Sequence, residues 1–333
     1  EKPDILLSYG GTNIEAFQPD ENFYDFSDAV WVDDLTDTSI NQTVYNGKII
    51  GLPHWEASVS GTLYNKEIFE KYNLEVPETW DDFLDVCRTL KEKEEIPLIV
   101  AGKENWQLMR YLSFAPWRMT KDRFIMDYIG KKETFSENTA AKEGVNLLYT
   151  LGTEGYFQGG FLSTDYTAAT DLFFGGTGCM WYSGSGQISQ ASDMYSKGEL
   201  GFFPVPDVAG QENMETNIPI HGGFGTAFNA QTYDDTMKGF FQYMCENYSD
   251  SCYNDAKVFS PFNDEIPEGL DQMFYDLQPL FETATDAWVS WDDKLDSATL
   301  TNLVDEQQKL AQGKEKPEEF EAAADQFIIN NSK

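Results

Sequence analysis

Apolar and polar residues follow two different periods between residues 45 and 90, and this change of period predicts strands followed by helices. Asn46-Gly47 is a turn dipeptide that precedes the apolar pair Ile49-Ile50. Gly51-Leu52-Pro53 is expected to break regular structure, because glycine and proline punctuate strands and helices. The alternating run over 60–64 then predicts a strand.

Two helices are expected after this strand. The first begins at Asn65, and the second carries apolar residues at helical spacing, namely Trp80, Phe83, Leu84, Cys87 and Leu90. Thr79 stands before the second helix and Asp82 follows three residues later, which is the spacing of a capping box. The sequence therefore predicts a well-defined start for this helix.

Strand and helix patterns alternate along the rest of the chain, which predicts an α/β fold. Residues 2–9 are expected to form a buried strand that opens onto Gly10-Gly11, as at the carboxyl end of a parallel strand where ligands bind. The other predicted strands span 96–101, 175–186 and 201–206, and the other helices span 105–114, 234–246 and 295–312, with a last helix from Pro317. No internal repeat or linker is visible, so two lobes would share the chain through several crossings.

Length and charge narrow the class of protein. A chain of 333 residues can bury a large core and suggests two domains or one large one. Lys and Arg number 23 and Asp and Glu number 57, which gives a formal net charge of −34. Such acidity repels nucleic acid and anionic lipid, so no nucleic-acid partner is expected. The acids are spread along the chain, and a solvated surface explains them better than a cationic ligand does.

The sequence contains no signature of a membrane span, a metal site or a cofactor site. No apolar run approaches the roughly 18 to 20 residues of a membrane helix. The cysteines at 87, 179, 245 and 252 form no C-x-x-C pair and are accompanied by two histidines, at 54 and 221, so neither zinc nor another cofactor is expected. Cys245 and Cys252 could form a disulfide only if the helix that carries Cys245 ends between them, because seven residues of helix span roughly 10 Å.

The motifs resemble those of the extracellular solute-binding proteins of bacterial ABC sugar importers, the family that includes maltose-binding protein. The shared elements are Asn46-Gly47-Lys48, Gly51-Leu52-Pro53, Tyr64-Asn65-Lys66 and Pro77-Glu78-Thr79-Trp80-Asp81-Asp82-Phe83, with weaker echoes at 173–186, 201–206, 222–229 and 313–327. The resemblance implies a two-lobed α/β periplasmic-binding-protein fold of type II with several inter-lobe crossings. It assigns 1–56 and 222–284 to lobe 1 and 57–221 and 285–333 to lobe 2. The first strand and helix of the family pattern have no counterpart in this sequence.

The resemblance also implies a function. Such a protein would bind an oligosaccharide or a similar neutral sugar outside the cell, close its lobes on it and deliver it to the permease of an ABC transporter. It would not be an enzyme. A monomer is expected, at the cell surface as a lipoprotein or in the periplasm, with the signal and lipid anchor outside the residues given.

A sugar site needs flat aromatic faces for the apolar sides of pyranose rings and polar groups for the hydroxyls. The chain has 24 Phe, 17 Tyr and 8 Trp, most of which must be core. By the resemblance, the ligand contacts are expected from Tyr9, Asn13, Trp55, Glu56, Trp106, Arg118, Gly222, Gly223 and Phe224, from Trp181 or Tyr182, and from Trp288 or Trp291. Each also has a structural interpretation, for example Trp55 as a core residue and Glu56 as a solvated acid.

Two other functions fit parts of the pattern. A glycoside hydrolase would need two carboxylates about 5 to 10 Å apart across a cleft, and the candidate pairs are Asp33-Asp34, Asp81-Asp82, Asp234-Asp235 and Asp292-Asp293. Three of these doublets stand at predicted helix starts, where acids offset the helix dipole, and a structural role is therefore favoured. A binding protein of the same fold could instead hold a polyamine or another cation between aromatic and acidic side chains.

Overall fold

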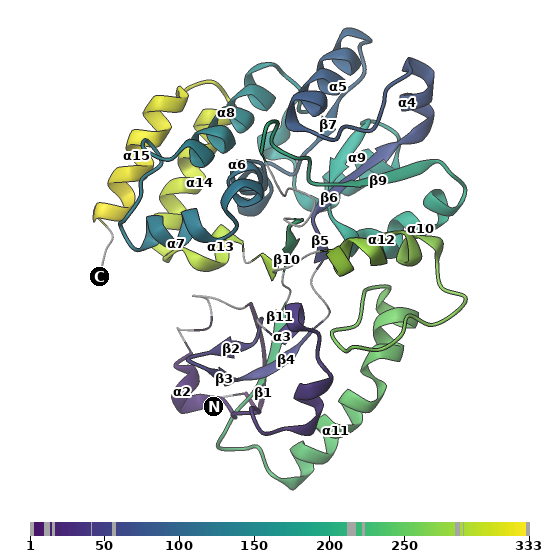
Figure 1. Cartoon of the computed structure of the whole chain (residues 1–333), viewed down its shortest axis with the longest axis vertical. Helices are drawn as coiled ribbons and strands as arrows, with labels where there is room; N and C mark the ends of the chain where they lie inside the picture. The colour runs from purple at the N-terminus through teal and green to yellow at the C-terminus, as the bar shows by residue number, and fades with distance from the viewer. Residues whose placement is uncertain are drawn as a thin grey trace. The chain divides into compact units, whose positions relative to one another are not determined.

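The computed structural model describes residues 3–9, 14, 17–40, 42–54, 58–211, 218–221, 224–283, 287–288 and 290–330. Contacts divide the chain into two compact units, each with its own β-sheet and helices (Figure 1). Unit 1 comprises 1–59, 185–196 and 220–294, and unit 2 comprises 60–184, 197–219 and 295–333. The chain passes repeatedly from one unit to the other, as the predicted fold with several crossings requires.

The two units differ from the predicted lobes in two longer segments, and the boundaries at 57–59 and 220–221 shift by two or three residues. Residues 185–196 and 285–294 group with unit 1, whereas the predicted boundaries place both in lobe 2. The first segment carries helix α10 (Ile188–Ser196), which packs against α12 (Gln272–Thr283) of unit 1. The assignment of lobes remains a prediction.

Unit 1 is built on an antiparallel sheet of strands β1 (Ile5–Tyr9), β11 (Phe224–Phe228) and β4 (Gly51–Pro53), in the order β1-β11-β4. A hairpin of β2 (Val44–Tyr45) and β3 (Lys48–Ile49) precedes β4. Asn46 and Gly47 join its strands with φ angles of +49° and +78°. Two successive positive φ angles are the mark of a type I′ hairpin turn, so the predicted turn is confirmed.

The predicted break at Gly51-Leu52-Pro53 is wrong, because these residues form β4 and pair with residues 225–227 of β11. The glycine has a packing reason: a Cβ atom at Gly51 would lie 2.5 Å from the carbonyl oxygen of Thr226. Pro53 stands at the last position of the strand, where a missing N–H costs the ladder little. Glycine and proline here fit a strand that closely approaches its neighbour.

The prediction of a buried, parallel-type strand over residues 2–9 is also wrong. Strand β1 pairs antiparallel with β11, and in the described part of the chain β11 is its one neighbour in the sheet. Leu7 is 61% exposed and Ile5 36% exposed. An apolar run indicates a strand but does not reveal which side of it is covered, since its neighbour comes from residues more than two hundred positions away.

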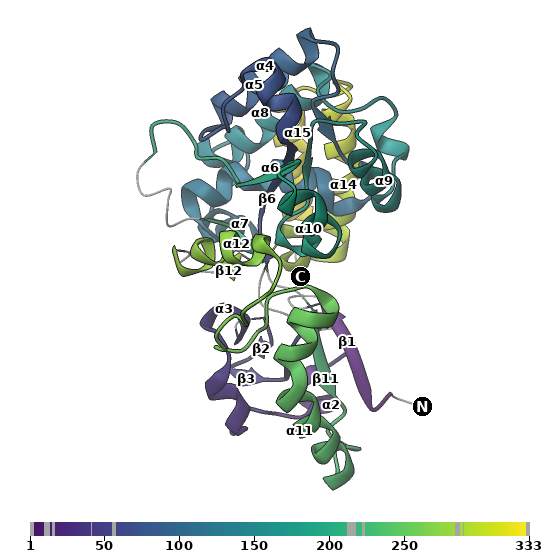
Figure 2. The same ribbon diagram turned by 90° about the vertical axis from the view of Figure 1, so that its right-hand side faces the viewer.

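Helix α11 (Asp235–Asp250) packs along one face of this sheet (Figure 2). Asp234 caps its first turn by accepting hydrogen bonds from the backbone N–H groups of Thr236 and Met237. Phe241 is the fully buried residue of the helix and packs with Phe228 of the sheet, their ring centroids 4.7 Å apart. The predicted helix over 234–246 is confirmed and extends one turn further.

The continuation of α11 decides the pairing of Cys245 and Cys252. The helix runs through Cys245 to Asp250 without a break, and a π-helical turn (Ser251–Ala256) carries Cys252. Both cysteines are free thiols. Helical structure therefore continues from Cys245 through Cys252, with a change only from α- to π-helix at Ser251, so the chain does not turn back to bring the two thiols together.

The other elements of unit 1 are short and surround the β1-β11-β4 sheet and helix α11. They are α2 (Pro19–Asn22), the 3-10 helix η1 (Val30–Asp34), α3 (Asp37–Ile40), η3 (Ser185–Gln187), α13 (Trp291–Lys294) and a second small sheet of β5 (Ser58–Val59), β10 (Ile220–His221) and β12 (Ala287–Trp288) in the order β12-β10-β5. A core of Phe26, Val32, Leu35, Ile49, Leu52, Phe228, Phe241 and Phe262 joins η1, the sheet and α11.

Unit 2 contains a four-stranded sheet covered on both faces. Its strands are β7 (Leu98–Ile99), β8 (Met180–Tyr182), β6 (Gly61–Asn65) and β9 (Leu200–Pro204), in the order β7-β8-β6-β9. Thr62 of β6 pairs with both Tyr182 and Phe203, so these side chains share one face of the sheet. Phe203 meets Phe83 of α5 (Trp80–Glu92), and Tyr182 meets Phe114 of α6 (Asn105–Thr120). Helix α9 (Tyr166–Phe174) covers the opposite face through Phe173.

The remaining helices of unit 2 include α4 (Lys66–Tyr72), α7 (Arg123–Ile129), α8 (Thr139–Thr153), α14 (Ser297–Ala311) and α15 (Pro317–Asn330). Helices α8, α14 and α15 pack together, as Figure 1 shows. Three predicted helix starts are confirmed: Asn65 caps α4, Thr79 and Asp82 form the capping box of α5, and Pro317 opens α15. Helix α6 runs past its predicted end at Phe114 and contains Pro116.

The corner between α14 and α15 supplies a pH-dependent contribution to stability. Burial and the neighbouring Glu306 carboxylate raise the pKa of Glu315 to about 7 from its ordinary 4.5. The folded state therefore binds this proton more tightly than the unfolded state, and the stabilisation is present below pH 4.5 and lost as the pH rises toward 7. We expect the free energy of unfolding to fall over this interval, and Glu315→Gln to flatten the fall.

Denaturant unfolding at several pH values between about 4 and 8 measures this slope. Glu318→Gln changes an exposed acid of the same corner and serves as the control. An unaltered slope in the Glu315 variant would show that the proton is held elsewhere.

Candidate functional site

The predicted contact residues fall into three groups in the structure. Asn13, Trp55, Glu56, Gly222 and Gly223 lie outside the described residues. Tyr9, Phe224 and Trp288 are placed by their strands, without a description of their side chains. The side chains of Trp106, Arg118, Trp181, Tyr182 and Trp291 are described.

Strand register brings Tyr9 and Phe224 together at one edge of the first sheet of unit 1. Tyr9, the last residue of β1, pairs with Phe224, the first residue of β11. The neighbouring Gly225 pairs with Pro53 at the end of β4. Because β11 is antiparallel to both strands, the last residues of β1 and β4 lie beside the first residues of β11.

The second small sheet extends the same edge. His221 pairs with Trp288 of β12 and with Ser58 of β5. His221 and Phe224 are only three residues apart in the chain, which keeps them within about 11 Å of each other. We define the strand-end edge as the set of residues Tyr9, Pro53, Ser58, His221, Phe224 and Trp288. Within it, Pro53 and Ser58 stand on the two sides of 55–57, and His221 and Phe224 stand on the two sides of 222–223.

The backbone on both sides of 55–57 is anchored by hydrogen bonds. On one side, the Nε2 atom of His54 lies 2.7 Å from Oγ1 of Thr226, and the Tyr248 hydroxyl donates to the His54 carbonyl oxygen at 2.6 Å. Burial lowers the pKa of His54, which favours the neutral imidazole. On the other side, the backbone N–H of Val59 donates to Oγ of Ser185. The chain therefore enters and leaves the predicted contact segment at fixed points.

Trp106 lies in the first turn of α6 in unit 2 and is partly exposed. Its ring centroid is 5.6 Å from that of Tyr166 and 6.4 Å from that of Tyr182. The guanidinium carbon of the buried Arg110 lies 5.4 Å from the Trp106 ring, in the range of a cation–π contact. The indole is thus held in one orientation by its neighbours, as a stacking platform requires.

Alternation along β8 separates the two aromatic candidates of that strand. Tyr182 shares the face of Trp106 and is 6% exposed, whereas Trp181 points to the opposite face and is fully buried against Tyr166, Phe173 and Phe174. Trp181 is therefore a core residue of unit 2, which is the structural interpretation that the sequence left open. Trp291, in the first turn of α13, is likewise buried, with 2% of its surface exposed.

Arg118 is 3% exposed and forms an ion pair with Asp207 within unit 2. A guanidinium committed to a carboxylate neutralises a charge that would otherwise be buried unpaired. Of the described candidates, Trp106 is the one whose exposure and packing best fit a ligand platform.

The aspartate doublets have structural roles at three helix starts. Asp82 completes the capping box of α5, Asp234 caps α11, and Asp292 and Asp293 lie in the first turn of α13. This confirms the structural interpretation of these doublets. Among the described residues, no group of three or more His, Cys, Asp or Glu side chains is placed to hold a metal ion, and no helix there is long and apolar enough to cross a membrane.

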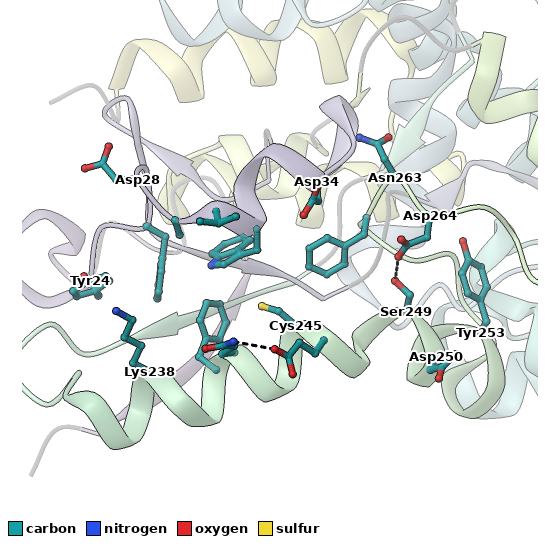
Figure 3. A pocket seen from close by; sticks show the side chains of 18 of the residues that line it. Tyr24, Asp28, Asp34, Lys238, Cys245, Ser249, Asp250, Tyr253, Asn263 and Asp264 are labelled. Carbon is teal, nitrogen blue, oxygen red and sulfur yellow. Dashed lines mark hydrogen bonds between the residues drawn. The ribbon is translucent and has the colours of Figure 1, made fainter.

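The structure also contains a cavity that sequence patterns did not predict. It has a volume of about 1140 Å³ and lies in unit 1 between η1, α11 and the segment 262–267 (Figure 3). The lining residues come from three stretches separated by up to two hundred positions, and so no local pattern marks them. We call it the acidic cavity, because seven of its lining residues are carboxylates: Asp25, Asp28, Asp34, Glu246, Asp250, Asp264 and Glu265.

The division into two α/β units with repeated crossings fits the type II periplasmic-binding-protein fold, and comparison with known proteins identifies the family. The family model of the bacterial extracellular solute-binding proteins matches residues 2–247. The chain belongs to this family.

Two of the curated proteins that the chain resembles are sugar-binding proteins by name. The chain is 27% identical over 209 residues to the Multiple sugar-binding protein of Streptococcus mutans, a match that covers 61% of this chain and 50% of the relative. It is 32% identical over 114 residues to the Melibiose/raffinose/stachyose-binding protein MelE of Bacillus subtilis, covering 33% and 26%. The matches thus span about half or less of the length of these relatives.

Solved structures of low sequence identity share the fold over nearly the whole chain. A chitin oligosaccharide binding protein superposes with a TM-score of 0.85 at 21% identity, covering 99% of this chain and 84% of the other. RafE in complex with raffinose superposes with a TM-score of 0.77 at 18% identity, covering 98% and 85%. These likenesses confirm the predicted two-lobed α/β fold.

Proposed function

We propose that this protein captures an oligosaccharide outside the cell and delivers it to the permease of an ABC transporter. The observation that carries the proposal is the strand-end edge. In a chain of the solute-binding family, Tyr9 pairs with Phe224 and Trp288 pairs with His221, and these strand ends flank 55–57 and 222–223. The relatives named above, which bind several sugars, support a carbohydrate ligand.

Each proposed contact has a chemical task. Aromatic rings of Tyr9, Trp55, Phe224 and Trp288 would cover the apolar faces of sugar rings, and the Glu56 carboxylate and the Asn13 amide would bind hydroxyl groups. Gly222 and Gly223 would let the ligand approach the backbone, since they carry no side chain. Trp106 would supply a platform from unit 2, with Tyr182 behind it. Ligand binding would draw the lobes together, the closed form being the one delivered.

The same proposal implies an oligomeric state, a cofactor requirement and a location in the cell. The protein would act as a monomer, without a cofactor, in the periplasm or at the cell surface as a lipoprotein. It would not be an enzyme. Chromogenic glycosides are therefore expected to remain intact during prolonged incubation with the protein, and steady release of the chromophore would favour the glycoside hydrolase.

A panel of oligosaccharides identifies the ligand. The names of the relatives and structural neighbours suggest raffinose, stachyose, melibiose and chitin oligosaccharides as its members. A thermal-shift screen finds the sugar that stabilises the protein, because a ligand that binds only the folded state raises the melting temperature. Calorimetry then measures its affinity.

Replacement of Trp106 by alanine is expected to weaken binding of that sugar about tenfold, since one face of an aromatic platform contributes roughly 1.4 kcal/mol. The Tyr166 and Tyr182 rings pack at an angle against the Trp106 ring and cover part of it. A ligand would contact the part of the indole that these rings leave exposed. Trp106→Phe keeps a smaller ring in the same place and should retain most of the affinity. Equal affinities of the alanine variant and the parent would remove Trp106 from the site.

A further inference from the structure

The acidic cavity is lined entirely by residues of unit 1, and none of them is among the predicted sugar contacts. Its volume of about 1140 Å³ is at the upper end of the range for small-molecule sites. The cavity extends along α11 from Lys238 to Asp250. Twelve residues of α-helix correspond to a trough roughly 18 Å long.

Aromatic rings form the floor and one end of this trough. Phe26, Phe241 and Phe262 are buried beneath it, and Trp31 packs on Phe241 with its ring centroid 5.2 Å away. Tyr24 is 38% exposed and stacks at 4.1 Å on Tyr233. The partly exposed faces of Tyr24, Trp31 and Tyr233 can receive an alkyl chain or a cation.

Charge around the cavity is strongly one-sided. Against its seven carboxylates stands one lining cation, Lys238. Asp25, Glu246 and Asp264 accept hydrogen bonds from Ser27, Gln242 and Ser249. By contrast, the side chains of Asp28, Asp34, Asp250 and Glu265 make no hydrogen bond or ion pair with any residue in the described part of the chain. A cationic ligand could therefore pair with them without breaking an existing contact.

The distribution of these carboxylates distinguishes a long organic cation from a metal ion. A metal ion needs several ligands that converge on one point, and no described group of three or more His, Cys, Asp or Glu side chains does so. Figure 3 shows Lys238 and Tyr24 at one end of the cavity and Ser249, Tyr253 and Asp264 at the other, with Cys245 between them on α11. Negative charge thus lies along the trough and is strongest away from Lys238.

We propose that the acidic cavity is a second ligand site of the protein, for an elongated aliphatic polyamine. Its methylene segments lie against the partly exposed aromatic rings of the cavity, and its ammonium groups pair with the carboxylates at the rim, chiefly Asp34, Asp250 and Asp264. Lys238 sets the direction of the ligand, because a terminal ammonium group is repelled from that end. This site is separate from the proposed sugar contacts and does not depend on them.

Calorimetric titration with spermidine at low ionic strength tests the proposal. The double variant Asp34→Asn/Asp250→Asn is expected to bind spermidine roughly tenfold more weakly than the parent, since each lost partly exposed ion pair costs a few-fold in affinity. Lys238→Gln is expected to bind it more tightly. Both replaced aspartates are exposed and lack side-chain partners among the described residues, so folding should be unaffected.

A matched control separates this site from the general attraction of a polycation to a chain of charge −34. Asp33→Asn/Glu268→Gln changes the charge by the same amount at two exposed positions that do not line the cavity. It should leave spermidine affinity within about twofold of the parent. Equal weakening in both double variants, no measurable spermidine binding, or equally strong Mg²⁺ binding that is lost in the Asp34/Asp250 variant would overturn the proposal.

The oligosaccharide titration remains a separate readout. The Asp34/Asp250 variant should bind the sugar like the parent, because neither residue belongs to the predicted sugar contacts. A failure of spermidine to bind would leave the carbohydrate function standing, and a failure of all sugars would leave the polyamine site standing.

Discussion

Replacement of Gly144 by alanine is expected to destabilise unit 2 by about 3 kcal/mol, the upper part of the range for overpacking. Gly144 lies in the middle of α8, where this helix packs on α6. A Cβ atom at this position would overlap the carbonyl oxygen of Leu112, which is backbone and cannot rotate away. Pro116 lies four residues after Leu112 and has no N–H to donate to this oxygen. Gly144 therefore meets α6 at a point where the hydrogen-bond ladder of α6 lacks a bond.

The matched control for this prediction is Gly239→Ala in α11. Gly239 is also helical, but a Cβ atom there would meet nothing within 4 Å. Alanine should stabilise the protein at this position by about 0.5 to 1 kcal/mol, because it restricts the unfolded chain more than glycine does. Denaturant unfolding of both variants measures the two changes. Equal effects of the same sign would mean that the packing of α8 on α6 differs from that described.

Replacement of Glu56 by alanine is expected to weaken oligosaccharide binding by about tenfold to a hundredfold. A carboxylate that accepts hydrogen bonds from sugar hydroxyls contributes roughly 1.5 to 3 kcal/mol. The chain on either side of 55–57 is fixed by the bonds of His54 and Val59, so the substitution should leave the fold intact. Glu75→Ala, which changes an exposed acid of unit 2, is the control. Calorimetry with the sugar found by the panel measures the change, and unaltered affinity would exclude Glu56 from the site.

Local features of the fold could be predicted from the sequence. The capping box at Thr79 and Asp82 and the hairpin turn at Asn46-Gly47 are determined by residues within four positions of one another. Three of the aspartate doublets were correctly interpreted as helix starts for the same reason. In each case the partner of the key residue is near in the chain, and so its chemistry is visible in the pattern.

Features that depend on distant partners were missed. Gly51 was interpreted as a breaker because its reason, the carbonyl oxygen of Thr226, belongs to a strand 175 residues away. The burial of β1 was overestimated because an apolar run does not show what covers it. The acidic cavity could not be predicted either, since its walls are assembled from separate stretches.

The predicted ligand contacts stay a prediction, and the structure adds only where some of their strands end. The family pattern pointed to Tyr9, Phe224 and Trp288, and register makes the first two cross-strand neighbours and pairs the third with His221. Periodicity gave no answer for Trp181 and Tyr182, because both faces of a fully covered strand are apolar. Only the packing of helices on each face shows that Tyr182, and not Trp181, lies on the side of Trp106.

Calorimetric titration of the purified protein with the oligosaccharide panel tests the central claim most directly. The account predicts saturable binding of at least one member at a single site, a raised melting temperature, and little dependence on ionic strength, because a neutral sugar carries no charge to be screened. Absence of binding across the whole panel would contradict the carbohydrate function.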